Sequence, residues 1–90
     1  MTVELDIKII NRLGLHARAC AKLVKAAAGY ESRVELLQGD AHADAKSIMS
    51  LMMLAAPQGS QLTLRAVGAD AEAAAAEIIQ LINERFGEEE

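Results

Sequence analysis

The sequence predicts an α+β fold, an open-faced two-layer sandwich in which three helices cover one face of a four-stranded antiparallel sheet. Segments that alternate between apolar and polar residues are interspersed with segments whose apolar residues recur every three or four positions. The connections between these segments are short, which favours neighbouring placement of consecutive elements. With 90 residues, 52% of them hydrophobic, the chain can form one core but not two. We therefore expect one domain with the element order β-α-β-β-α-β-α.

The first half of the chain begins with a strand. Apolar residues at positions 3, 5, 7 and 9 alternate with charged ones, as in a half-buried strand. The "NRLG" at 11–14 ends it, and apolar residues at helical spacing then predict a helix from about His16 to Ala28, closed by Gly29 in a left-handed conformation. Alternation over 32–38 and the "GD" at 39–40 predict a hairpin into a short strand at 41–45.

The second half continues with a short helix, from Ile48 to Ala56, which Ser47 begins as N-cap and Pro57 ends. A last strand is expected at 61–67, followed by a helix with Asp70 as N-cap and an apolar stripe that continues to Phe86. We expect the domain to cover residues 1–87 and the acidic residues 88–90 to form a solvated tail.

Composition excludes several classes of function. The chain has no apolar run of the roughly 20 residues that cross a bilayer, and its start lacks the pattern of a secretory signal, so we expect a cytoplasmic protein without membrane insertion. A net charge of −4 and two aromatic residues argue against a nucleic-acid partner. The single cysteine, Cys20, cannot form an internal disulfide, and we expect an inert thiol and neither a metal site nor a cofactor.

The segment around His16 is the strongest candidate site. His16 lies where the glycine turn meets the first helix, close to the backbone N–H groups of Ala17 and Arg18, which have no partner within the helix. A phosphoryl group on His16 could accept hydrogen bonds from that backbone and meet the Arg18 guanidinium. Neutral imidazole is nucleophilic near physiological pH. A surface or capping histidine would fit the same spacing, so spacing alone does not decide.

Two motifs and the element order resemble a known family. "GLHARA" at 14–19 and "KSIM" at 46–49 are similar to motifs of the HPr family, the histidine-containing phosphocarriers of the bacterial phosphoenolpyruvate-dependent phosphotransferase system, and the resemblance covers Thr2 to Phe86. It implies that His16 accepts phosphate on Nδ1 from phosphorylated enzyme I and passes it to a histidine of an enzyme IIA domain. The protein would then be a monomeric carrier and a substrate of enzymes, not an enzyme itself.

The resemblance has one departure, at Ala19, where the family motif "GLHARP" has proline. Proline in the first turn of a helix fixes φ and gives up an N–H that has no partner there. Alanine keeps the helix but leaves its start less rigid, so we expect slower or looser transfer, not its loss.

Ser47 is the second site that the resemblance implies. It matches the regulatory serine that the ATP-dependent HPr kinase/phosphorylase phosphorylates, and this role is compatible with that of an N-cap. A phosphate would add about −1.5 to −2 charges at a helix N-terminus, which a helix tolerates. We expect it to weaken docking of enzyme I without unfolding the domain.

The helix after Ser47 has more apolar surface than one contact can bury. It could be buried on two sides, or it could leave an adaptable methionine patch for partners. The resemblance favours the patch, and the predicted docking residues are Ile48, Met49, Met52 and Met53.

Other functions remain open at this stage. The chain could serve the nitrogen-related branch of the system instead of sugar uptake. It could also be a regulatory module that docks through residues 48–53 without transferring phosphate. A Ser-His-Asp enzyme is excluded, because no aspartate is expected near His16 and the sequence has no nucleophile elbow.

Overall fold

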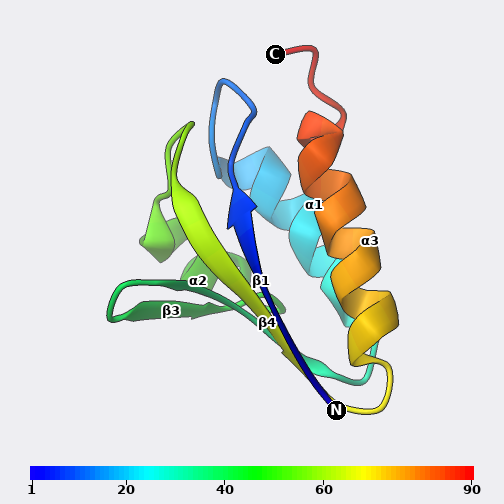
Figure 1. Cartoon of the computed structure of the whole chain (residues 1–90). Helices are drawn as coiled ribbons and strands as arrows, with labels where there is room; N and C mark the ends of the chain where they lie inside the picture. Colours follow the sequence, from blue (N-terminus) through cyan, green and yellow to red (C-terminus); the bar gives the residue numbers. More distant parts are fainter.

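The computed structural model describes all 90 residues and has the predicted element order (Figure 1). The elements are β1 (Thr2–Lys8), α1 (Ala17–Ala28), β2 (Arg33–Gln38), β3 (Ala41–Asp44), α2 (Ile48–Leu54), β4 (Gln61–Val67), α3 (Ala71–Asn83) and the short 3₁₀ helix η1 (Arg85–Gly87). None of the helices is long and apolar enough to cross a membrane.

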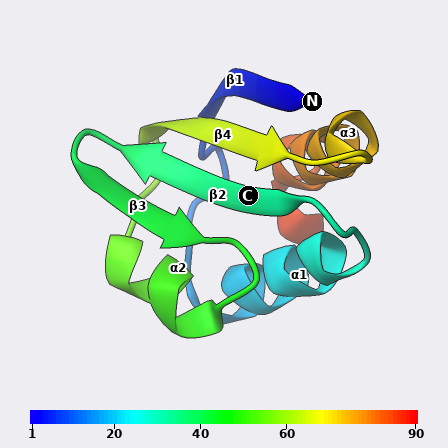
Figure 2. The ribbon, with the colours of Figure 1, turned by 90° about the horizontal axis from the view of Figure 1, so that it is seen from below.

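The four strands form one antiparallel sheet in the order β1-β4-β2-β3 (Figure 2). The register sets Leu5, Leu64 and Leu36 opposite one another on the face that the helices cover. Leu64 and Leu36 are fully buried, but Leu5 is 41% exposed because β1 is an edge strand. The opposite face is open to solvent, and there Arg65 of β4 lies 3.7 Å from Glu4 of β1.

The core lies between the sheet and the helices. Leu23 of α1, Leu51 of α2 and Ile78 of α3 are all fully buried against it. The apolar stripes predicted for α1 and α3 are thus the buried faces of these helices, and the predicted fold class is confirmed.

The ends of α1 and α2 differ from the prediction. Gly29 is right-handed, with φ −74°, so the expected left-handed closure of α1 is wrong; its N–H bonds to the Ala26 carbonyl instead. Helix α2 ends at Leu54, two residues early, because Ala55 turns left-handed with φ 50°. A proline disfavours helical conformation in the residue before it, here Ala56, which shortens the helix from that side.

Helix α3 begins where predicted, directly after Asp70, but its capping and its end differ from the prediction. Asp70 occupies the N-cap position without capping the helix, because its carboxylate accepts hydrogen bonds from the N–H groups of Glu31 and Ser32 and from the Ser32 hydroxyl. The helix ends at Asn83, and positive φ values at Arg85 and Phe86 then turn the chain so that Phe86 enters the core from η1.

Candidate functional site

His16 is the N-cap residue of α1, with an extended backbone that leads into the helix. The loop before it is fixed to the chain that follows α2, because the Leu15 N–H donates to the Ala56 carbonyl at 2.8 Å. Gly14 makes this approach possible: its φ is +67°, and a Cβ there would lie 2.7 Å from the Ala56 oxygen. The glycine of the motif therefore holds the histidine next to the end of α2.

Asn11 fixes the same loop from inside. Its side chain is fully buried, and Nδ2 donates to the Gly14 carbonyl at 2.8 Å and to Glu88 Oε1 at 2.9 Å. The Oδ1 atom has no hydrogen-bond partner. One amide thus joins the turn before His16 to the C-terminal segment of the chain.

The imidazole of His16 contacts that segment directly. Nε2 is hydrogen-bonded to Oε2 of Glu88, whereas Nδ1 makes no hydrogen bond. The side chains are 27% exposed for His16 and 15% exposed for Glu88, so the pair is shielded from most solvent but open on one side. The two residues are 72 positions apart in sequence.

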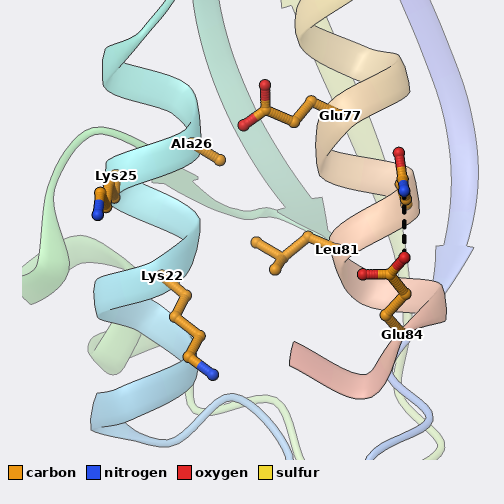
Figure 3. A pocket seen from close by; sticks show the side chains of 7 residues that line it. Lys22, Lys25, Ala26, Glu77, Leu81 and Glu84 are labelled. Carbon is orange, nitrogen blue, oxygen red and sulfur yellow. Dashed lines mark hydrogen bonds between the residues drawn. The ribbon is translucent and has the colours of Figure 1, made fainter. Parts of the chain in front are cut away.

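The expectation of a solvated tail over residues 88–90 is therefore wrong for Glu88, although Glu89 and Glu90 are exposed. The physical reason is the turn at η1. Phe86 is 1% exposed, and Lys22 of α1 donates to its carbonyl, which directs the next residues back toward the loop. Figure 3 shows Lys22 extending from α1 toward the chain that follows α3, and Figure 1 shows the C-terminus at the same end of the molecule as the loop after β1.

Arg12 holds the end of the segment. Its backbone N–H donates to the Glu90 carbonyl at 2.8 Å, and its guanidinium is 2.7 Å from the Glu90 carboxylate. The ion pair is exposed and contributes little by itself, but the backbone bond adds to it. Residues 88–90 are thus attached at both ends.

The surroundings of Glu88 favour its charged form. Partial burial alone would raise the pKa of this carboxyl, but the hydrogen bonds from Asn11 and His16, together with the charges of His16 and Lys22, lower it below its ordinary value. Glu88 therefore presents a carboxylate, not a carboxylic acid, to the imidazole at neutral pH.

The backbone beside His16 has the features expected of an anion site. The N–H groups of Ala17, Arg18 and Ala19 donate to no acceptor in the structure, and the first turn of α1 contains no acidic residue. Arg18 is exposed and makes no ion pair. The N-terminal end of α1 thus offers backbone donors without acceptors and, two residues after His16, a cation without an ion pair.

Ser47 is the N-cap of α2, as predicted, and its hydroxyl accepts from the Ser50 N–H at 3.2 Å. The seven residues of α2 span about 10 Å. Because the other end of α2 leads to Ala56, which contacts the His16 loop, Ser47 lies at the far end of this helix from His16.

The four predicted docking residues are exposed, so α2 is not buried on two sides. Exposure is 41% for Ile48, 71% for Met49, 45% for Met52 and 81% for Met53, and of the residues of α2 only Leu51 is fully buried. Leu13, which the sequence analysis did not single out, is 65% exposed in the loop before His16.

Cys20 and the groove between α1 and α3 are weaker candidates for a functional site than His16. Cys20 is fully buried, and burial raises the pKa of its thiol, as expected for an inert cysteine. The groove between α1 and α3 in Figure 3 is lined by lysines from α1 and glutamates from α3 and its C-cap, and all of these charged residues are exposed.

Comparison with known proteins shows the family to which the chain belongs. Residues 3–84 match the family model described as the PTS HPr component phosphorylation site. The chain belongs to the HPr family. It is accordingly a phosphocarrier of the phosphotransferase system and not a catalytic enzyme.

Individual HPr proteins match along almost the whole chain. The phosphocarrier protein HPr of Cupriavidus necator is 48% identical over 88 residues, which cover 98% of this chain and 99% of that protein. The phosphocarrier protein NPr of Shewanella violacea is 38% identical over 86 residues, covering 96% and 94%. The crystal structure of HPr from Thermoanaerobacter tengcongensis superposes with a TM-score of 0.94 at 39% identity, covering 98% of this chain and 99% of that one.

Proposed function

We propose that His16 accepts a phosphoryl group on Nδ1 from phosphorylated enzyme I and passes it to a histidine of an enzyme IIA domain. The observation that carries this proposal is the position of His16 at the N-cap of α1, beside three backbone N–H groups that have no acceptor. A phosphoryl group on the ring would accept hydrogen bonds from the N–H groups of Ala17 and Arg18 and gain from the helix dipole.

Arg18 supplies the countercharge in this proposal. Its side chain is exposed and has no acidic partner, so it can turn toward the phosphoryl group without breaking an existing ion pair. Ala19 in place of the family proline keeps its backbone N–H, but the residue is fully buried, so the exposed donors at this helix end are those of Ala17 and Arg18. The looser start of α1 is expected to slow transfer without abolishing it.

Partners would dock on the exposed apolar side chains of α2. Ile48, Met49, Met52 and Met53 are exposed along α2, and the C-terminal end of this helix leads to the chain that bonds to Leu15 of the His16 loop. Methionine side chains adapt to partners of different shape, which suits a carrier that meets both a donor and an acceptor. We expect the carrier to act as a monomer in the cytoplasm.

Ser47 is the proposed regulatory site for HPr kinase/phosphorylase in bacteria that have this enzyme. A phosphate there would stay at a helix N-terminus, where the helix dipole favours negative charge. Since Ile48 and Met49 are the next residues along α2, the added charge would lie within the docking surface. The modification would thus act on docking and leave the ring of His16 unchanged.

The test is transfer of labelled phosphate from phosphoenolpyruvate through purified enzyme I to the native chain, to His16→Ala and to Ser47→Ala. We expect acid-labile label on the native chain and on Ser47→Ala, and none on His16→Ala. Absence of label on the native chain, while the same enzyme I phosphorylates another carrier, would rule out the carrier role and favour a docking module that transfers no phosphate.

A nitrogen-related carrier is the second candidate, supported by the similarity to the NPr of Shewanella violacea. Transfer to purified enzyme IIA domains of the two branches distinguishes the candidates. The sugar branch is expected to receive phosphate faster, because Ser47 and the "KSIM" motif are typical of that branch.

A further inference from the structure

We infer that Glu88 is a positioning residue for phosphotransfer: its carboxylate holds the Nε2 proton of His16 and so leaves the Nδ1 lone pair as the nucleophile. This inference rests on the proposed function of His16. It starts from the contact between Glu88 Oε2 and His16 Nε2, the sole hydrogen bond of the ring.

The contact selects one form of the neutral ring. A neutral imidazole carries one N–H, either on Nδ1 or on Nε2, and the nitrogen without hydrogen is the nucleophile. A carboxylate only accepts, so Glu88 favours the form with hydrogen on Nε2. The Nδ1 lone pair is then free for attack, on a residue directly followed by Ala17 and Arg18, whose N–H groups have no acceptor.

The same contact would stabilise the product. When Nδ1 attacks, an N–P bond forms with its lone pair, and the bond between phosphorus and the donor breaks with its electrons leaving on the donor. His16 keeps its Nε2 proton and becomes a phosphorylated imidazolium. A carboxylate beside an imidazolium stabilises its positive charge, as the aspartate of a Ser-His-Asp triad does. When the group moves on, the N–P electrons return to Nδ1 and the ring is neutral again.

Glu88 is held firmly enough for this role. Its other oxygen, Oε1, accepts from the buried Asn11 amide at 2.9 Å, and its side chain is only 15% exposed. The preceding turn is fixed by the burial of Phe86, and the following residues are fixed by the backbone bond from Arg12 to Glu90. Because the Glu88 carboxylate is already held in place, no conformational entropy is lost in positioning it during the reaction, which favours transfer.

The first test measures the ring form without any partner protein. Nitrogen-15 NMR of His16 at mildly alkaline pH is recorded for the native chain, Glu88→Ala, Glu88→Gln and the control Glu89→Ala, which changes an exposed neighbour whose side chain makes no hydrogen bond or ion pair. We expect hydrogen on Nε2 in the native chain and in the control, and a mixture of both forms in Glu88→Ala. Glu88→Gln is expected to be intermediate, because its amide oxygen can still accept but carries no charge.

The second test measures transfer from enzyme I with the same four proteins. Glu88→Ala is expected to transfer roughly tenfold more slowly, with the KM for enzyme I changed less than about twofold, because the loss falls on the orientation of a functional histidine and not on docking. Thermal unfolding of each variant is measured alongside, and a native-like melting curve of Glu88→Ala attributes the slower transfer to the ring.

The outcomes separate this inference from the proposed function. If the native chain is not labelled on His16, the carrier proposal fails, whatever the NMR result. If His16 is labelled but Glu88→Ala keeps the native ring form, or transfers as fast as or faster than the native chain, the carrier proposal stands and the positioning role of Glu88 is overturned.

Discussion

Two features of the structure require glycine at position 14, a positive φ and a close approach of the Ala56 carbonyl, and the cost of replacing it can be measured. Its φ of +67° lies in the region that side chains other than glycine seldom adopt, and the Ala56 carbonyl fills the space where a Cβ would point. Gly39 provides a matched comparison. Its φ is +59°, but a Cβ added there would meet no atom within 4 Å.

We predict that Gly39→Ala lowers the free energy of unfolding by about 1 kcal/mol, the cost of left-handed backbone at alanine. Gly14→Ala should add a clash worth a further 1–3 kcal/mol or so, because the obstructing atoms belong to backbone. Urea unfolding of both variants measures the difference. Equal losses would show that the loop before His16 adjusts freely and that contact with Ala56 does not fix it.

Arg18 should affect function and not stability. Its side chain is exposed and unpaired, so Arg18→Ala is expected to change the free energy of unfolding by less than about 0.5 kcal/mol. Transfer to His16 should nevertheless slow, and Arg18→Lys should restore part of the rate, because lysine keeps the charge but loses the bidentate geometry. Rates with enzyme I and melting temperatures of the two variants check this, and a native rate for Arg18→Ala would contradict the role of countercharge.

The residues near His16 differ in how well the sequence revealed them. His16, Ala17 and Arg18 are consecutive, so the geometry of one helix start was sufficient to bring them together. Glu88 is 72 residues away, and the three glutamates at 88–90 have the composition of a solvated tail. The turn that brings residues 88–90 back to the His16 loop depends on positive φ at Arg85 and Phe86. Neither residue is glycine, so the sequence does not indicate positive φ at these two positions. Two signals were available: Phe86, an apolar anchor that holds the following residues near the core, and Gly87, which continues the turn with a φ of 79°.

At the scale of the element, α2 is the short helix whose two roles can be separated. One role is its N-cap at Ser47, and the other is its division between one buried side chain, Leu51, and several exposed ones. A helix of seven residues gains little from its own hydrogen bonds, so the cap and the buried contact provide most of its stability.

For the cap, we predict that Ser47→Ala lowers the free energy of unfolding by about 1 kcal/mol, because the Ser50 N–H loses its acceptor. Ser47→Asp should keep the cap and the stability while adding the negative charge that a phosphate would bring. Titration with enzyme I is expected to show weaker binding for Ser47→Asp than for Ser47→Ala. Equal binding by the two variants would contradict an electrostatic mechanism of regulation at this site.

For the two sides of the helix, we predict opposite effects of truncation. Leu51→Ala should cost about 2–5 kcal/mol, because Leu51 is fully buried. Met53→Ala should leave the unfolding curve almost unchanged, since this side chain is 81% exposed, yet should weaken binding of enzyme I. Unfolding and binding measured on the same preparations give the comparison, and unchanged binding of Met53→Ala would remove it from the docking surface.

The apolar pattern of α2 was harder to interpret than that of the other helices. In α1 and α3, polar residues alternate with the apolar stripe, so the buried face could be assigned from sequence. In α2 all residues but Ser50 are apolar, so the pattern gives no direction. Helix α2 packs against β3 and α1, with Leu51 fully buried and Leu54 partly buried, and this packing, not hydropathy, determines which residues are exposed.

At the scale of the whole molecule, strand and helix order follow from periodicity, whereas the joints between elements depend on tertiary contacts. Asp70 is an example, because it looks like an N-cap but bonds to the chain that enters β2. Hydrogen bonds from the Ser32 hydroxyl and from the Glu31 and Ser32 N–H groups lower the pKa of this carboxyl from its ordinary value of 3.8. We therefore expect the joint between α3 and β2 to weaken in acid.

The sign of that sensitivity follows from linkage. A carboxyl whose pKa is lower in the folded state stabilises the fold above the unfolded pKa, and this contribution disappears as the pH falls through the folded pKa. We predict that Asp70→Asn is less stable than the native chain at neutral pH and that the difference shrinks below about pH 4. Urea unfolding from pH 7 to pH 2, with exposed Asp6→Asn as control, measures it; a difference independent of pH would contradict this assignment.

The open face of the sheet and the burial of Cys20 together make the molecule suitable for site-specific labelling. Cys20 is the one cysteine of the chain, it is fully buried, and burial disfavours its reactive thiolate. A cysteine introduced as Glu4→Cys, on the solvent side of β1, would be the sole thiol that a maleimide dye reaches. A fluorophore there would report on encounters with each partner, while the helix surface that contains Met49 and Met53 stays unmodified.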